Sequence, residues 1–472
     1  GGDVARGGAS VEGGRRVTLT LRPYQRAMLA EGRATYTPGG PPISVLFQLP
    51  TGGGKTALGL ATNLSHIAKD PANRIGWFAH RDELVEQPLA KLRAWGAPVC
   101  ALRPGERQDE SARIVVASIQ TVLARGLDIL PRFSMVVFDE ARHYASAPQW
   151  SEIAAAVSKG RHVIGLDATP SGPLHLLFRH IVKGPSVADL TAAGFLCPAV
   201  HIGPEREQDG LAATPLDAYL EHVAPHRALV FCRDVSHAMA TTRAFQAAGV
   251  RAECVEGKTG TKKRRAHLDA YQRGEVDVLV NVHCLTEGTD LPATVGIIVA
   301  RKVGEEETWI QIGGRGLRPS PGKARALLLD LYGQTARLGL MSELRPWSLD
   351  GKGLPSRPID LPACVKCPNC HALAPPLGTC PGCGRIAPPR PPPKLSKAEM
   401  KVLAQDRLAR SGSEWDAFQS LVWESRAKGW KPQAVGFIFM QQYGRRPRWR
   451  LDHVGPAPAG WVVPPKRVRE VA

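Results

Sequence analysis

Two short segments of this sequence carry residues suited to phosphate chemistry. Residues 50–56 read Pro-Thr-Gly-Gly-Gly-Lys-Thr and stand between an apolar run and a stretch with a helical pattern. Glycines let backbone N–H groups close around phosphate oxygens, while Lys55 can reach the outer phosphates and Thr56 can hold Mg²⁺. The strict pattern has glycine where this chain has Leu49, so a plain Gly-rich turn is the alternative.

A pair of adjacent carboxylates, Asp139 and Glu140, ends another apolar run about 85 residues later. At the end of a buried strand, Asp139 can bind Mg²⁺ through water, and Glu140 can orient and deprotonate an attacking water. Two adjacent acids alone mean little, but their position after a glycine-rich loop predicts a site that binds ATP with Mg²⁺ and hydrolyses it.

Cysteines indicate a second kind of chemistry. Five of the ten lie between residues 364 and 383, and four of these form the pairs Cys367-Pro-Asn-Cys370 and Cys380-Pro-Gly-Cys383. Four thiolates on two tight turns predict a closed, structural Zn²⁺ site, whose metal would be the main source of folding energy for a loop-rich segment. A redox dithiol is the alternative chemistry, and Cys364 offers an alternative pairing frame, although we take it as the spare cysteine. His371 is expected at the surface.

The net charge of +18 indicates a polyanionic partner, because basic surfaces bind phosphates by releasing their counterions. From Met341 onward there are 21 Lys and Arg against 10 Asp and Glu, which accounts for +11 of that charge. Tryptophans alternate there with basic residues, a composition suited to stacking on bases, although the indoles could instead form the core of a small helical bundle. These tryptophans are Trp415, Trp423, Trp430 and Trp449.

The length of 472 residues suggests about three domains. Apolar, β-branched runs alternate with helical stretches, which predicts an α/β fold of two similar parallel-sheet lobes. Strands are expected at residues 43–49, 75–79, 114–118, 135–138 and 163–166 in the first lobe, and at 228–232, 252–255, 276–281, 295–300 and 326–331 in the second. No apolar run approaches the roughly 20 residues that a membrane helix needs, and no secretory segment is recognisable, so a cytoplasmic protein without membrane contact is expected.

The predicted domains follow from these patterns. They are a disordered start (1–16), a first lobe that binds ATP (17–185), a second lobe (186–345), a zinc ribbon (362–386), a proline-rich linker (387–393) and a basic helical segment that binds nucleic acid (394–455).

From Leu21 to Gly339 the motifs arrive in the order seen in superfamily 2 helicases of the DEAD/DEAH-box kind. The chain resembles their XPB-like and type III restriction-enzyme-like branch, particularly phage and prophage helicases with a C-terminal zinc ribbon. The resemblance implies two RecA-like lobes that close on ATP, with Arg315 and Arg318 of the segment 311–318 acting as arginine fingers. Opening after product release would then move the nucleic acid.

The resemblance also implies roles for further residues. Those implied around the nucleotide are Tyr24, Gln25 (paired to the adenine edge), Thr51, Gly52, Gly53, Gly54, Gly288, Asp290 and Gln311. Those implied along the nucleic-acid backbone are His80, Arg81, Ser118, Thr121 and Arg233.

Two positions depart from the family pattern. The family usually has His where this chain has Arg142, and Ser or Thr where it has Asp167. Complementary charges at both positions predict an ion pair that replaces a hydrogen bond and connects the ATP site, through Arg142, Asp167 and Thr169, to the rest of the motor. In the alternative, His143 takes over and Arg142 points to solvent.

The function expected from these features is an ATP-dependent helicase or translocase, a nucleic-acid-dependent ATPase acting on DNA. An RNA helicase and the motor subunit of a restriction or defence complex are alternatives. A non-hydrolysing scaffold is disfavoured by the intact Lys55, Asp139, Glu140, Arg315 and Arg318. Proteins of replication, recombination or defence complexes are the expected partners.

Overall fold

The computed structural model describes residues 20–350 and 364–387, except 38–39, 81–83, 104–108, 145–152, 154, 158–159, 287–289 and 376–377, and scattered residues between 418 and 457. The chain divides into two compact units, Gly1–Pro388 and Pro389–Ala472. The predicted disordered start, the linker from residue 388 and most of the C-terminal segment lie outside the described residues.

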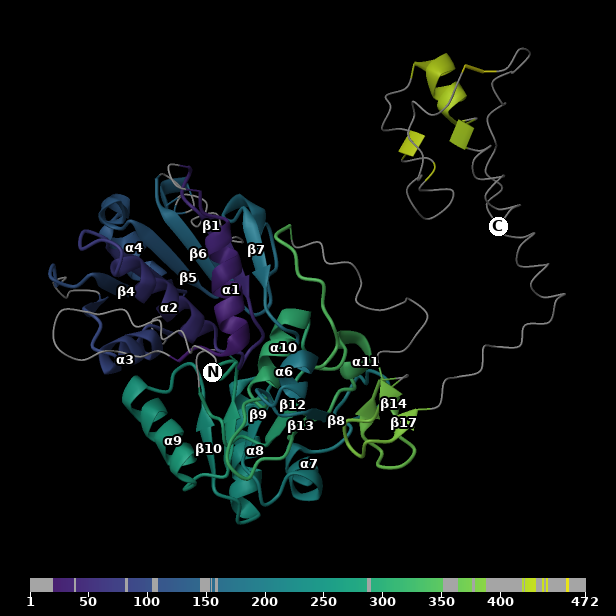
Figure 1. Ribbon diagram of the computed structural model, residues 1–472. Coiled ribbons are helices and arrows are strands. Elements are labelled where there is room, and N and C mark those ends of the chain that lie inside the picture. The colour runs from purple at the N-terminus through teal and green to yellow at the C-terminus, as the bar shows by residue number, and fades with distance from the viewer. Residues whose placement is uncertain are drawn as a thin grey trace, which may run out of the picture. The chain divides into compact units, whose positions relative to one another are not determined.

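Lobe 1 is a parallel sheet of seven strands in the order β3-β4-β2-β5-β6-β1-β7 (Figure 1). The strands are β1 (Ser44–Gln48), β2 (Ile75–Ala79), β3 (Val99–Leu102), β4 (Ile114–Ser118), β5 (Met135–Asp139), β6 (His162–Asp167) and β7 (His180–Lys183). The α-helices are α1 (Pro23–Ala34), α2 (Lys55–Ile67), α3 (Glu86–Ala94) and α4 (Ile119–Arg125), with short 3₁₀ turns η2 (Leu127–Arg132), η3 (Ala141–Tyr144) and η4 (Leu174–Leu176). Strands β1, β2 and β4 are buried along their whole length, as expected for a parallel sheet covered on both faces.

Lobe 2 repeats this plan with the parallel order β10-β11-β9-β12-β13-β8. Its strands are β8 (Ala199–Ile202), β9 (Ala228–Cys232), β10 (Ala252–Val255), β11 (Val278–Asn281), β12 (Gly296–Ala300) and β13 (Ala326–Asp330). Its helices are α6 (Val187–Ala192), α7 (Pro215–His222), α8 (Val235–Ala247), α9 (Thr261–Arg273), α10 (Glu306–Gly314) and α11 (Thr335–Leu338).

The cysteine segment joins the sheet of lobe 2. Strand β15 (Leu373–Ala374) pairs antiparallel with β8 through Leu373 and His201, and β14 (Val365–Lys366) pairs with β15. Strands β16 (Gly378–Thr379) and β17 (Ile386–Ala387) form a separate hairpin. The first cysteine turn is therefore built onto the sheet edge and does not stand apart from lobe 2.

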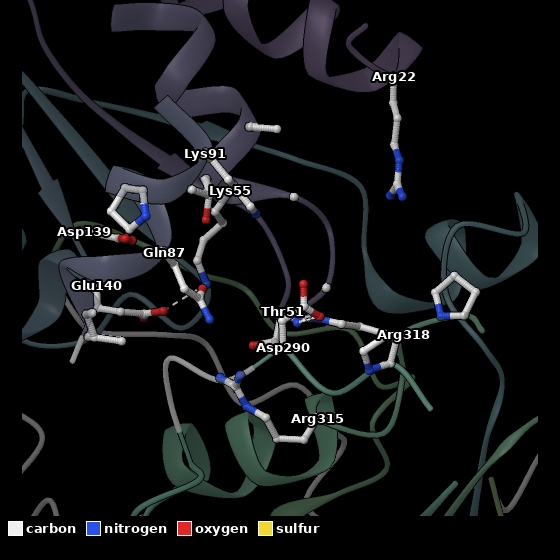
Figure 2. Close-up of a pocket in the computed structure, with 18 residues that line it drawn as sticks. Arg22, Thr51, Lys55, Gln87, Lys91, Asp139, Glu140, Asp290, Arg315 and Arg318 are labelled. Atoms are coloured by element: carbon white, nitrogen blue, oxygen red, sulfur yellow. Dashed lines mark hydrogen bonds and ion pairs between the residues drawn. The ribbon is translucent and has the colours of Figure 1, made fainter. Parts of the chain in front are cut away.

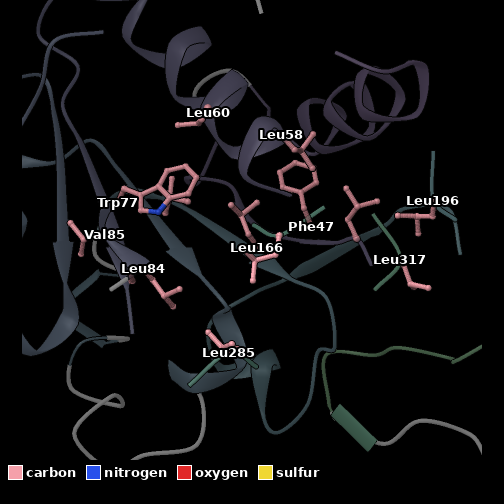
Figure 3. Packing of buried hydrophobic residues seen from close by; sticks show 14 of the residues in the cluster. Phe47, Leu58, Leu60, Trp77, Leu84, Val85, Leu166, Leu196, Leu285 and Leu317 are labelled. Atoms are coloured by element: carbon pink, nitrogen blue, oxygen red, sulfur yellow. The ribbon is translucent and has the colours of Figure 1, made fainter. Parts of the chain in front are cut away.

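One buried apolar cluster contains residues of both lobes. Leu58, Trp77 and Leu166 belong to lobe 1, whereas Leu285 and Leu317 belong to lobe 2, and all five lie in the same cluster (Figure 3). Burying such a side chain stabilises the folded state by about 1.5–3 kcal/mol, and the apolar cores of the two lobes are continuous through this cluster.

In the second compact unit, described by itself, Phe418, Val422, Val435 and Phe439 form a small buried cluster. Trp423 packs partly against it, in agreement with the core role considered for these tryptophans. The other three tryptophans lie outside the described residues. No described helix is both long enough and apolar enough to cross a membrane.

Candidate functional site

The Gly-rich segment 50–56 forms the turn between β1 and α2. Gly52 and Gly54 have φ values of 86° and 90°, in the left-handed region that glycine adopts without strain. Helix α2 begins at Lys55, so the positive end of its dipole and its free N–H groups lie at the turn. These features suit the binding of an anion. Leu49, the departure from the strict pattern, is fully buried in the core.

The two carboxylates follow β5 and face this turn. Glu140 Oε1 lies 3.2 Å from Lys55 Nζ, and both side chains are largely buried. Glu140 also has a φ of 53°, which is uncommon for a non-glycine residue, and such backbone strain tends to cluster at functional sites. Burial, followed by the neighbouring Glu140, raises the pKa of Asp139 to about 7, with Lys55 acting in the opposite direction.

A pocket of about 340 Å³ lies between the lobes and brings the predicted groups together (Figure 2). Lobe 1 contributes the helix start at Lys55 with Asp139 and Glu140, and lobe 2 contributes Arg315 and Arg318. The volume lies within the range of about 300–1,000 Å³ that is usual for small-molecule sites. Thr51, Gly52, Gly54, Thr56 and Asp290 also line it, as do Arg22, Gln87 and Lys91, for which the sequence predicted no role at the nucleotide.

Side chains of the segment 311–318 contact residues on both sides of this pocket. Gln311 Nε2 lies 3.5 Å from Glu140 Oε2, a contact between the lobes. Arg315 Nε donates to the carbonyl of Thr286 at 2.9 Å, and Arg318 pairs with Asp290. Gly314 packs directly on the Gly-rich turn of residues 50–56, the phosphate loop, since a Cβ at Gly314 would lie 2.7 Å from that of Thr51.

Asp139 and Thr56 offer oxygen ligands of the kind that Mg²⁺ prefers. Both line the pocket beside Lys55, and the raised pKa of Asp139 marks a carboxylate that a nearby cation would stabilise. The donor set therefore fits a divalent cation bound with a nucleotide.

Arg142 does not point to solvent. Its Nη1 lies 3.3 Å from Asp167 Oδ1 and 3.4 Å from Glu140 Oε2, and it also donates to Thr169 Oγ1 at 2.5 Å. Asp167 is fully buried and accepts the backbone N–H groups of Arg142 (2.7 Å) and Thr169 (2.9 Å). The predicted contact between Arg142 and Asp167 is present, and His143 joins the network at Arg142 Nη2.

The side chains of Tyr24 and Gln25 hold the phosphate loop through its backbone carbonyls. Tyr24 Oη donates to the carbonyl of Gly53 at 2.6 Å, and Gln25 Nε2 donates to the carbonyls of Gly53 and Gly54 at 3.2 Å. Gln25 is buried, so its amide braces the loop in this structure. The predicted pairing of Gln25 with an adenine edge stays a prediction.

The residues predicted along the nucleic acid differ in their exposure. Ser118 and Thr121 are buried, and Ser118 Oγ caps α4 by accepting the N–H of Thr121 at 3.2 Å. His80 is buried and stacks on His143 with ring centroids 4.0 Å apart. These three side chains are therefore occupied in lobe 1 and do not line a surface, whereas Arg233 is exposed. Arg81 and Gly288 lie outside the described residues.

Four thiols meet beside the β8 edge of the lobe 2 sheet. The Sγ atoms of Cys367, Cys370, Cys380 and Cys383 all lie within 4.8 Å of one another, at 3.8 Å for Cys367–Cys383 and 3.5 Å for Cys370–Cys380. Sulfurs around a tetrahedral Zn²⁺ with Zn–S bonds of about 2.3 Å would be about 3.8 Å apart, so the arrangement fits such an ion.

The residues after each pair, His371 and Gly384, share the same backbone geometry. Their φ values are 59° and 72°, and their backbone N–H groups donate to the backbone carbonyls of Cys367 and Cys380, each at 2.9 Å. This repetition gives two equivalent turns. His371 is exposed, whereas Cys364 is buried with Leu340 and Leu373 and does not belong to the group of four.

Comparisons with known proteins agree with this geometry. Residues 18–172 match the family described as "Type III restriction enzyme, res subunit", and residues 212–320 match the "Helicase conserved C-terminal domain". These matches define the class, and the chain belongs to the superfamily 2 helicases, in the branch related to type III restriction enzymes.

Two relatives illustrate this membership. The Schizosaccharomyces pombe protein named "Putative mitochondrial ATP-dependent helicase irc3" is 29% identical over 370 residues, which cover 69% of this chain and 59% of that protein. A "51.5 kDa protein" of a Lactococcus phage is 22% identical over 70% of this chain and 75% of its own length. The chain thus spans less than two thirds of the yeast relative.

Solved structures support the fold alone. A fragment described as a "putative HsdR subunit of a type I restriction enzyme from Vibrio vulnificus YJ016" superimposes with a TM-score of 0.54 and 20% identity, over 70% of this chain and 67% of that one. The "DUF1998 helicase MrfA bound to DNA" gives a TM-score of 0.52 at 15% identity, over 66% and 48%. The predicted class of two tandem parallel-sheet lobes is confirmed.

Proposed function

We propose that this chain is an ATP-driven helicase or translocase that acts on nucleic acid. The observation that carries the proposal is the pocket where Lys55, Asp139 and Glu140 of lobe 1 face Arg315 and Arg318 of lobe 2. A nucleotide bound there would be held by both lobes, so its hydrolysis and release would change their separation. A motor that advances along a strand needs such a cycle.

Each group has a definable task in hydrolysis. Lys55 and the N–H groups of the phosphate loop would bind the β- and γ-phosphates, and Glu140 would take a proton from the attacking water. Arg315 and Arg318 would stabilise the charge that develops on the γ-phosphate. Mg²⁺, held through Thr56 and Asp139, would neutralise charge on the phosphates. Lys55 pairs with Glu140 in the structure, and phosphates bound to Lys55 would compete with that ion pair.

Arg142 is proposed to connect the carboxylate that activates water to the segment after β6. Its Nη1 atom lies within contact distance of Glu140, Asp167 and Thr169 at once. A change in the position of Glu140 would therefore shift Arg142 and alter its hydrogen bond to Thr169.

The four thiols are proposed to bind one structural Zn²⁺. All four ligand positions are protein thiols, so no position is open for catalysis. The metal would hold the two turns together where the segment has few apolar residues of its own.

DNA is the proposed substrate. The family is described by a restriction enzyme subunit, and a Haloarcula marismortui relative, 26% identical over 53% of this chain, is named "Putative DNA 3'-5' helicase Rad25". Excess positive charge suits either nucleic acid.

The test is steady-state ATP hydrolysis measured in parallel with single-stranded DNA, forked DNA, duplex DNA and RNA, with Lys55→Ala as the blank. The proposal predicts turnover that is stimulated by a DNA and abolished in the variant. Stimulation by RNA alone would make the chain an RNA helicase. If none of the four nucleic acids supported ATP hydrolysis, the non-hydrolysing scaffold would be the remaining interpretation.

A further inference from the structure

Residues 340–350 run from lobe 2 back to lobe 1 (Figure 1). They follow α11, pass beside α10 and end at η4, the short turn that follows β6 in the chain. The chain has already crossed between the lobes once, in the stretch from β7 to β8. We call residues 340–350 the strap.

The strap is attached to α10 by a buried arginine. Arg345, whose side chain is 6% exposed, donates from Nε to Glu306 Oε1 at 2.5 Å. Its Nη1 and Nη2 atoms donate at 2.9–3.1 Å to the backbone carbonyls of Leu338, Leu340 and Glu343. One guanidinium thus ties the first turn of α10 to the folded start of the strap, a use of several fixed donors that lysine does not match.

Two further contacts fix α10 against the same segment. Trp309 is fully buried and donates its Nε1–H to the carbonyl of Gly339 at 2.9 Å. Gly313 packs so closely on Met341 that a Cβ at Gly313 would lie 2.3 Å from the Met341 sulfur. The helix is therefore held along its length, from Glu306 to the residues just before Arg315.

The other end of the strap is anchored on lobe 1. The carbonyl of Leu349 accepts the backbone N–H of His175 at 2.8 Å, and its side chain packs against a buried cluster that includes Leu174 and Phe178. A cavity of about 220 Å³ beneath the strap is lined by both lobes, for example by Ala168 and Ile310.

We propose that Arg345 is a positioning residue for the arginine fingers, acting through a strap that holds α10 at a set distance from lobe 1. Helix α10 leads directly into Arg315, so any shift of the helix moves Arg315 and Arg318 relative to Lys55. Small misplacements of reacting groups lower rates steeply. The inference rests on the proposed ATPase activity and adds the residues that set its geometry.

The strap is tested by releasing it at either end. Arg345→Met frees the α10 end, and Leu349→Asp frees the lobe 1 end. Leu344→Asp is the matched control, because Leu344 lies in the same strap but is 68% exposed. The measurements are kcat and KM for ATP, the Kd for ADP, and energy transfer between dyes on non-natural amino acids at the exposed positions Glu31 and Arg243.

If the strap acts as a single tether between the lobes, Arg345→Met and Leu349→Asp should have the same effect. Each should lower kcat about fivefold and reduce energy transfer in the nucleotide-free protein, while the Kd for ADP stays within about twofold. The kcat of the double variant should be no lower than that of either single variant, since a strap released at one end no longer restrains α10. Arg345→Lys should recover kcat in part, and Leu344→Asp should behave as the unaltered chain.

Several results would overturn the inference. They are unchanged kcat in Leu349→Asp, equal losses in Leu344→Asp and Leu349→Asp, or losses that multiply in the double variant. If Arg345→Met does not fold, Leu349→Asp with its control still decides the outcome. Failure of the proposed function is distinguishable, because the unaltered chain would then hydrolyse no ATP at all.

Discussion

Replacing the pair Arg142 and Asp167 by the residues that the family usually has there tests the most unusual feature of the site. Arg142→His and Asp167→Ser each remove one partner of a buried ion pair, in which Arg142 is 9% and Asp167 0% exposed. Breaking such a pair on one side costs about 3–5 kcal/mol, because the remaining charge stays buried. Asp167→Ser also removes the acceptor of two backbone N–H groups.

The double variant should recover part of that loss. A histidine and a hydroxyl can form a neutral hydrogen bond, and no charge is left unpaired at either position. We expect an interaction free energy of about 2–3 kcal/mol between the two substitutions, near the upper end for residues in contact. A simple exchange of the two charged residues is a poorer test, since arginine at position 167 could not accept the N–H groups of Arg142 and Thr169.

The assay is urea denaturation of all four proteins together with the kcat for ATP hydrolysis. Arg132→His serves as the control, because Arg132 is exposed on the same lobe. Additive losses of stability and activity in the double variant would refute the reasoning, as would single variants that behave like Arg132→His.

Three further predictions concern close packing, metal and pH. Gly314→Ala should lower kcat at least tenfold, because the added Cβ would collide with the phosphate loop. Gly304→Ala is the control, since the space around Gly304 is open. Equal activity of the two variants would exclude the close packing of Gly314 on Thr51 during hydrolysis. The purified chain should hold about one zinc per molecule by metal analysis; Cys380→Ser should lose it and unfold at lower temperature, while Cys284→Ser should keep it. Burial lowers the pKa of His201 to about 3, so the imidazole is neutral in the fold but takes up a proton in the unfolded chain below about pH 6.5. Stability should be full above that pH and fall by up to about 1.4 kcal/mol per unit below it, and a His201→Gln variant that shows the same slope would assign the loss to other groups.

Much of the fold could be predicted because parallel strands leave a local signal. All ten predicted strands are present, and their bounds differ from the observed ones by two residues at most. Strands β3, β7 and β8 were missed because each has only four residues and is partly exposed. Polar residues also interrupt β7 and β8, at His180, Lys183 and His201. The joining of β15 to β8 could not be predicted either, because it pairs residues about 170 positions apart.

The candidate site was predictable to the extent that its residues form motifs. Lys55, Asp139, Glu140 and the two arginines stand in recognisable patterns, and they meet in one pocket. Arg22 and Lys91 also line it, but single basic residues near helix ends look like ordinary solvated charges in a sequence. The burial of Ser118 and Thr121 was likewise hidden, because a short polar side chain at a strand end suits a helix cap as well as a nucleic-acid contact. The domain boundaries remain predictions.

The central claim is that lobe 2 supplies charge to a nucleotide held by lobe 1. Single-turnover hydrolysis of ATP by Arg315→Ala, with ATP binding measured on the same protein, tests it most directly. We predict binding within about threefold of the unaltered chain and hydrolysis slower by a factor of at least about 10³, as for other arginine fingers. Hydrolysis at the normal rate in this variant would contradict the claim.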